Sequence, residues 1–244
     1  MSTPPGPSER RLLTVAFCDL VGSTALSAGI DDETYAEVMA RYYASAQKVV
    51  TGHGGFVARR EGDGIFVYIG HPHPHEDDAD RAVRMGLELV ETISRIHDGR
   101  GGRLRGRVGI HTGPTVMVRS ELEPTSMAFG FTPNFAARLE GTAEPGQVLI
   151  SSATAALLRG EFDLGEHVNV PIDDTTSLTA RPVLAAHDRN RLVSTRLPAP
   201  FVGRGDLLAR LHERWAEAVL VGTRPVVVVG EPGGGKARRA AELI

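Results

Sequence analysis

The sequence predicts an α+β fold in which one twisted sheet is covered by helices. Apolar, β-branched runs typical of buried strands alternate with amphipathic stretches of helical period, and a Gly-Asp-Gly sequence joins two apolar runs as a hairpin. Of the 244 residues, 41% are hydrophobic and 23% are charged, as in ordinary globular proteins. A chain of this length accommodates one sizeable domain and a smaller segment.

The predicted elements follow one another through the first 187 residues. Strands are expected at residues 12–18, 56–60, 65–69, 105–113, 115–119, 148–151 and 182–187. Helices are expected at residues 32–52, 75–97, 132–140 and 152–158. Asp31 or Asp32 can cap the first helix, and Pro133 falls in the first turn of the third, where proline is tolerated.

Composition excludes several classes of protein. The formal net charge of −3 argues against general binding to nucleic acids or anionic membranes, and no apolar run reaches the length of a membrane span. Residues 1–11 lack the apolar core of a signal peptide, so we expect a short disordered tail there. The single cysteine, Cys18, excludes an internal disulfide and fits a cytoplasmic protein.

A domain boundary is expected after residues 12–187. Residues 188–200 are polar, basic and contain prolines, as is typical of a linker. In residues 201–244, GEPGGGKA follows an apolar run and has the glycine and lysine spacing of a Walker A loop, in Gly230, Gly235 and Lys236. Ala237 stands where that loop has serine or threonine, so we expect a degenerate, truncated P-loop segment.

Two aspartates, Asp19 and Asp63, stand at the edges of apolar runs. Each alone has an ordinary structural explanation, because Asp-Gly is a hairpin turn signal and an aspartate at a strand end can cap a helix. Carboxylates on neighbouring strands can also hold two Mg²⁺ ions on a polyphosphate. The sequence therefore leaves both a structural and a metal-binding interpretation open at each position.

The predicted helix at residues 132–140 carries a second polar pair. Asn134 and Arg138 are four residues apart, so they lie on one helical face. An asparagine can orient a sugar, and an arginine can neutralise charge that develops on a phosphate. A surface helix with a solvated Arg138/Glu140 face is the alternative explanation.

The segment HPHPHEDD, residues 71–78, contains three histidines and three acidic residues. A transition-metal site is one interpretation of this pattern. The alternating prolines favour an extended loop instead, with the acidic residues at a helix N-terminus. We therefore expect a structural role for this segment.

Taken together, FCDLVGST (17–24), EGDGIFVYIG (61–70) and TPNFAARLE (132–140) resemble the motifs of class III nucleotidyl cyclases. The resemblance runs from about Leu12 to His187, and the last segment resembles the start of the ATPase domain in bacterial cyclase–ATPase fusions. It implies a ferredoxin-like cyclase homology domain with a mostly antiparallel sheet. It also implies conversion of ATP, or alternatively GTP, to a 3′,5′-cyclic monophosphate and pyrophosphate.

The resemblance assigns roles to individual residues. It implies two Mg²⁺ or Mn²⁺ ions per site and a homodimer with shared sites, in which the metals and the transition-state helix come from different protomers. The implied metal ligands are Asp19, the carbonyl of Leu20 and Asp63; the phosphate-binding residues are Gly22, Ser23 and Thr24; the transition-state residues are Asn134 and Arg138.

The base pocket departs from the family pattern. Arg59 stands where the family has a lysine, and Met127 stands where it has an aspartate or threonine. Arginine is a bulky planar fork and methionine is a poor hydrogen-bond partner. A catalytically weak or inactive cyclase homology domain that binds nucleotide or a partner is therefore the alternative to an active enzyme.

Overall fold

The computed structural model describes residues 8–118, 127–159, 162–173, 175–187, 209–210 and 213–214. The chain divides into two compact units, Met1–Ala186 and His187–Ile244. In the second unit, description beyond His187 is limited to two pairs of helical residues. The linker expected at 188–200 therefore lies outside the described residues, as does nearly all of the segment at 201–244.

The described strands of the first unit form one mixed sheet with the order β2-β3-β1-β4-β6-β9-β7, in which β5 pairs with β4 and β8 pairs with β9. Neighbouring strands are antiparallel except for β4 and β6, which are parallel. The strands are β1 (Ser8–Leu20), β2 (Phe56–Glu61), β3 (Gly64–Ile69), β4 (Gly106–Val118), β5 (Met127–Phe129), β6 (Val148–Ser151), β7 (Phe162–Leu164), β8 (Val168–Pro171) and β9 (Ser177–Ala186).

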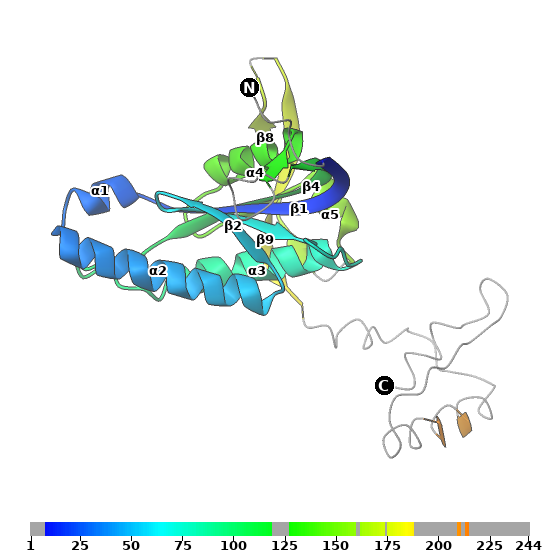
Figure 1. The fold of residues 1–244 in the computed structure, drawn as a ribbon, viewed down its shortest axis with the longest axis horizontal. Helices are drawn as coiled ribbons and strands as arrows, with labels where there is room; N and C mark the ends of the chain where they lie inside the picture. The colour runs from blue at the N-terminus through cyan, green and yellow to red at the C-terminus, as the bar shows by residue number, and fades with distance from the viewer. Residues whose placement is uncertain are drawn as a thin grey trace, which may run out of the picture. The chain divides into compact units, whose positions relative to one another are not determined.

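Helices cover both faces of this sheet, as the α+β prediction requires (Figure 1). They are α1 (Ser23–Ser27), α2 (Asp32–Gly52), α3 (Asp78–Ile93), α4 (Phe131–Thr142) and α5 (Ser152–Leu157). Residues of α2 and α3 pack with Ala16 and Cys18 of β1 in the larger core, whereas Ala136 of α4 packs with Leu13 and Val15 from the other side of β1. In the part of the chain that the structure describes, no helix is long and apolar enough to cross a membrane.

Local signals identified several elements correctly. The helix predicted at residues 32–52 is α2, and the Asp31 side chain caps it by accepting a hydrogen bond from Thr34 N at 2.8 Å. The predicted hairpin is β2 and β3, joined by a turn at Gly62 and Asp63. Gly62 has φ of 58°, a left-handed conformation that glycine adopts without strain.

Two strands are longer than predicted. β1 begins at Ser8 rather than at residue 12, because β4 extends far enough to pair with residues 8–11, which were expected to belong to a tail. The two strands expected at 105–113 and 115–119 are one continuous strand, β4. Pro114 does not interrupt it. On one edge of β4 the pairing with β6 ends at Ile110 and the pairing with β5 begins at Val116, so Pro114 falls in a gap there, while β1 pairs along the other edge throughout.

A chain of buried polar groups crosses the sheet beneath α4 and α5. His111 Nδ1 lies 2.8 Å from Ser151 Oγ, which lies 3.0 Å from Thr154 Oγ1. Thr154 then donates to Thr112 Oγ1 at 3.2 Å, and Thr112 lies 3.0 Å from the hydroxyl of Thr14. Burial lowers the pKa of His111 from its ordinary value of 6.5 to about 4. The imidazole is therefore neutral at pH 7 and contributes to the core.

This buried histidine predicts a pH-dependent contribution to stability. Because its pKa is lower in the folded protein than in the unfolded chain, its contribution is complete above pH 6.5 and is lost as the pH falls towards 4. The free energy of unfolding of the wild type minus that of His111→Gln should therefore shrink between these two pH values in urea titrations. A difference that stays constant across the window would contradict the prediction.

Candidate functional site

Two aspartates meet at one end of the sheet. Asp19 is the penultimate residue of β1, and Asp63 lies in the turn between β2 and β3. The pairing of β1 with β3 runs as far as Cys18 and Ile65, so both aspartates lie just beyond the paired residues. The Asp63 carboxylate lies close enough to Asp19 to raise the pKa of Asp19. The structure thus brings together the two aspartates that the sequence singled out.

The aspartate pair concentrates negative charge in a half-buried place. Burial, and then the neighbouring Asp63 carboxylate, raises the pKa of Asp19 to about 6, although a backbone hydrogen bond from Leu20 and the side chain of Arg107 oppose the shift. Asp63 Oδ2 is buried and has no hydrogen-bond partner among the described residues. Adjacent carboxylates with an unpartnered buried oxygen fit the demand of a divalent cation for oxygen ligands.

The protein offers few ligands for such a cation. Among the described residues, no group of three or more His, Cys, Asp or Glu side chains is arranged to hold a metal ion. Asp19 and Asp63 would therefore supply two carboxylates and leave the other positions to backbone oxygen, water or phosphate. Mg²⁺ is commonly bound in this manner, so the residues present fit Mg²⁺ or Mn²⁺.

The loop after β1 presents backbone groups beside the aspartates. Leu20 ends β1 and is buried, with 3% of its surface exposed. Gly22 has φ of 77° and begins α1, in which Ser23 and Thr24 are the first two residues. Nothing lies within 4 Å of the place where a Cβ of Gly22 would be, so its backbone is open to a ligand. The residues expected to bind phosphate therefore lie directly after Asp19.

Arg107 and Glu140 belong to this site although the sequence did not single them out as functional. Arg107 lies opposite Asp19 in the β1–β4 ladder, with Nη2 3.5 Å from Asp19 Oδ2 and Nε 2.6 Å from Glu140 Oε1. Burial raises the pKa of Glu140 to about 6 despite Arg107. The alternative of a solvated Arg138/Glu140 face does not apply to Glu140, whose side chain is only 13% exposed.

Asn134 and Arg138 occupy the outer face of α4. Both are exposed, and Arg138 Nη1 donates to the carbonyl of Pro171 at 3.2 Å. The opposite face lies so close to β4 that a Cβ on Gly109 would be 2.1 Å from the backbone nitrogen of Glu140. No contact in the described part of the chain joins Asn134 or Arg138 to the aspartates. The structure therefore keeps the two predicted sets of residues apart within one chain.

The two residues expected at the purine also lie apart. Arg59 pairs with Glu61 at 2.9 Å and lines a hollow of about 190 Å³ together with Phe17, Gly64 and Phe66. Met127 lies instead on β5, opposite Val118, and is not among the residues that line this hollow. The sequence did not single out Glu61 as a residue of this hollow. Its place there comes from the ion pair with Arg59 on β2.

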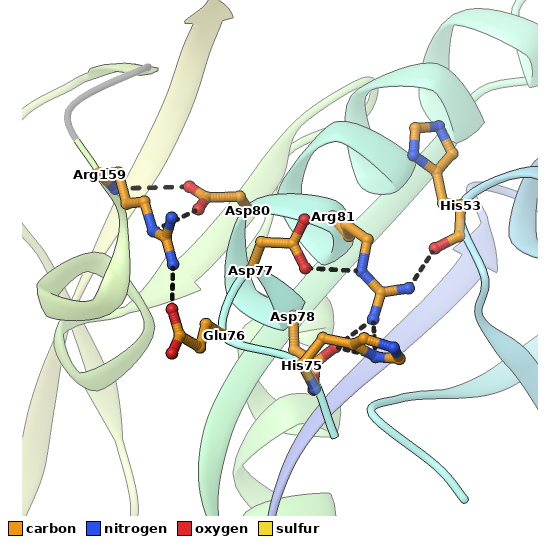
Figure 2. Close-up of polar contacts among 8 residues, drawn as sticks. All are labelled: His53, His75, Glu76, Asp77, Asp78, Asp80, Arg81 and Arg159. Carbon is orange, nitrogen blue, oxygen red and sulfur yellow. Dashed lines mark hydrogen bonds and ion pairs between the residues drawn. The ribbon is translucent and has the colours of Figure 1, made fainter. Parts of the chain in front are cut away.

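The acidic segment before α3 has a structural role, as the sequence favoured. Figure 2 shows Arg81 between the segment and the end of α2. Arg81 donates to the carbonyl of His53 at 2.9 Å, pairs with Asp77 at 3.3 Å and also binds Asp78. On the other side, Arg159 lies 3.3 Å from Glu76, and its backbone N–H donates to Asp80 at 3.4 Å. These arginines pair with the carboxylate oxygens that would otherwise be available to a metal ion.

The structure does not place the residues of the expected P-loop. Gly230, Gly235 and Lys236 lie outside the residues that the structure describes.

Residues 8–180 match the family model described as "Adenylate and Guanylate cyclase catalytic domain". An adenylate cyclase of Mycobacterium tuberculosis (strain ATCC 25618 / H37Rv) is 28% identical over 64% of this chain and 36% of its own length. An uncharacterised protein of Rhizobium meliloti (strain 1021) is 28% identical over 96% of this chain and 23% of its own. The crystal structure of the guanylyl cyclase Cya2 superposes with a TM-score of 0.70 at 29% identity, covering 76% of this chain and 97% of that one.

The chain thus spans about a quarter to a third of the length of these two curated relatives.

The crowded carboxylates predict that removing one charge stabilises the metal-free protein. Asp19→Asn keeps the shape of the side chain and removes the repulsion from Asp63, so thermal unfolding in EDTA should shift upward by about 2–4 °C, the shift expected for roughly 1 kcal/mol in a domain of this size. Added Mn²⁺ should raise the unfolding temperature of the wild type and leave that of the variant unchanged. A lower unfolding temperature of Asp19→Asn in EDTA would contradict this account.

Proposed function

Since the chain belongs to the family of adenylate and guanylate cyclase catalytic domains, we propose that it converts ATP into 3′,5′-cyclic AMP and pyrophosphate. The observation that carries the proposal is the pair of neighbouring carboxylates, Asp19 and Asp63, in which the buried Asp63 Oδ2 has no hydrogen-bond partner among the described residues. Carboxylates crowded in this way are typical of functional sites, where a bound cation offsets their repulsion. The mycobacterial relative, named an adenylate cyclase, supports ATP as the substrate.

Asp19, Asp63 and the carbonyl of Leu20 hold two divalent cations in this proposal. When bound, these cations neutralise the triphosphate and increase the acidity of the ribose 3′-hydroxyl. The backbone of Gly22, Ser23 and Thr24 faces the phosphates, and the left-handed conformation of Gly22 permits their close approach. Arg107 keeps Glu140 paired, so that this third carboxylate does not compete for the cations.

Asn134 and Arg138 complete the site from a second copy of the chain. Both side chains are exposed, one turn apart on the face of α4 that is turned away from β4, so they can reach a partner once Arg138 releases the carbonyl of Pro171. Asn134 orients the ribose, and Arg138 neutralises the charge that develops on the α-phosphate. A homodimer of this kind contains two equivalent sites.

The hollow beside Arg59 and Glu61 receives the base. Arg59 supplies donors for ring nitrogens and Glu61 supplies an acceptor for the adenine amino group, while Phe17 and Phe66 provide apolar walls. Met127 contributes apolar surface rather than a hydrogen bond. A base site of this composition also accommodates the edge of guanine, so selection between the two purines is weak.

The second candidate is a cyclase homology domain that binds nucleotide without substantial turnover. It is favoured by the ion pair between Arg59 and Glu61, because an arginine engaged by a carboxylate binds a base less firmly. The hollow of about 190 Å³ is also smaller than typical small-molecule pockets, which begin at roughly 300 Å³.

A product assay separates the two candidates. Purified protein with Mn²⁺ should form cyclic AMP from ATP, and cyclic GMP more slowly from GTP, whereas Asp19→Ala should be inactive and Arg138→Ala should lose about 10²–10³-fold in rate. Chromatography of the nucleotides measures both products. If the wild type at high concentration makes no more product than Asp19→Ala, while still binding nucleotide, the silent module is the correct function.

Mixing inactive variants tests the shared sites. A dimer of Asp19→Ala with Arg138→Ala contains one intact site, so random mixing should restore about one quarter of the wild-type activity. Asp19→Ala mixed with Asp63→Ala is the matched control and should remain inactive, because both changes affect the same half of each site. Absence of recovery in the first mixture would contradict a site built from two chains.

A further inference from the structure

Two consecutive tyrosines of α2 hold the turn that carries Asp63. Tyr42 is fully buried, and its hydroxyl donates to the backbone carbonyl of Asp63 at 2.9 Å. The hydroxyl of Tyr43 donates to the carbonyl of the preceding residue, Gly62. Since the turn between β2 and β3 consists of Gly62 and Asp63 alone, every carbonyl of the turn is bound from α2.

The same hydroxyl of Tyr42 reaches the strand of the other aspartate. It lies 3.8 Å from the sulfur of Cys18, a long and weak contact, and Cys18 immediately precedes Asp19. The Cys18 side chain points into the core that α2 covers. The Tyr42 hydroxyl therefore contacts the turn that carries Asp63 and the residue that precedes Asp19.

Asp63 depends on this backbone support because few groups hold its carboxylate directly. Its Oδ2 finds no hydrogen-bond partner among the described residues, and the neighbouring Asp19 repels it. With the buried Oδ2 unpartnered among the described residues, the direction of the Asp63 side chain depends on the conformation of the turn. Gly62, with φ of 58°, makes that turn adaptable unless its carbonyls are fixed.

We propose that Tyr42, assisted by Tyr43, is a positioning residue that orients Asp63 for metal binding through the backbone of the turn. This inference rests on the proposed function in that it takes Asp63 as a metal ligand. Tyr43 contributes less, because it is only partly buried and water can replace its hydroxyl. Its ring is held in place by Arg60, whose guanidinium lies 5.1 Å from the ring centre.

The test compares Tyr42→Phe and Tyr43→Phe with Tyr68→Phe. Tyr68 is equally buried, and its hydroxyl accepts a hydrogen bond from Ala128 N at 2.8 Å. Loss of this hydroxyl therefore destabilises the fold without removing a hydrogen bond to the turn at Gly62 and Asp63. Mn²⁺ affinity is measured by electron paramagnetic resonance well below the unfolding temperature of every variant. Supporting groups of metal ligands commonly change affinity by about 10–100-fold.

Tyr42→Phe should weaken Mn²⁺ binding by about 10-fold, Tyr43→Phe by a smaller factor, and Tyr68→Phe not at all. Unchanged affinity in Tyr42→Phe would overturn the inference, as would an equal loss in Tyr68→Phe, which would indicate general destabilisation.

Asp63→Asn distinguishes failure of this inference from failure of the proposed function. If the wild type and Asp63→Asn bind Mn²⁺ equally, Asp63 is no metal ligand and the proposed function is wrong. Amide hydrogen exchange of residues 62–64 in the metal-free protein then decides the remaining point. Faster exchange in Tyr42→Phe than in Tyr68→Phe supports positioning of the turn by Tyr42, and equal exchange overturns it.

Discussion

Repulsion between two carboxylates is the constraint around which this domain is organised. Asp19 and Asp63 lie near each other in a half-buried place, and their mutual charge disfavours the folded, metal-free state. The surroundings offset part of this cost: Leu20 donates from the backbone, Arg107 lies beside Asp19, and Tyr42 holds the turn. The backbone of β1 and side chains from α2 and β4 thus support two carboxylates that repel each other.

Much of the fold could be predicted because its elements carry local signals. The cap at Asp31 and the Gly-Asp turn located α2 and the hairpin within a residue or two. The ends of the strands were predicted less accurately. β1 begins where its neighbour β4 can pair with it, and not where its own apolar run begins. The short strands β5, β7 and β8 were missed for the same reason, since they owe their existence to long partners.

The residues of the site also divide into those with local sequence signals and those that depend on long-range contacts. Asp19, Asp63, Asn134 and Arg138 stand in recognisable motifs, so the sequence alone could nominate them. Arg107, Glu140 and the two tyrosines could not be found in this way, because their importance arises from contacts across 19 or more residues of sequence. Tyr42 is one of the buried residues of α2, and an apolar position in a helix indicates a core residue rather than a functional one.

The absence of a side chain at Gly109 determines how α4 can move. The helix backbone lies against the strand at this point with no room for even a methyl group, and buried side chains on both flanks of α4 lock it there. Sliding of the helix over the sheet would separate surfaces that are already in full contact. The backbone that carries Arg138 therefore moves together with the sheet, and only the exposed side chain of Arg138 can reorient on its own.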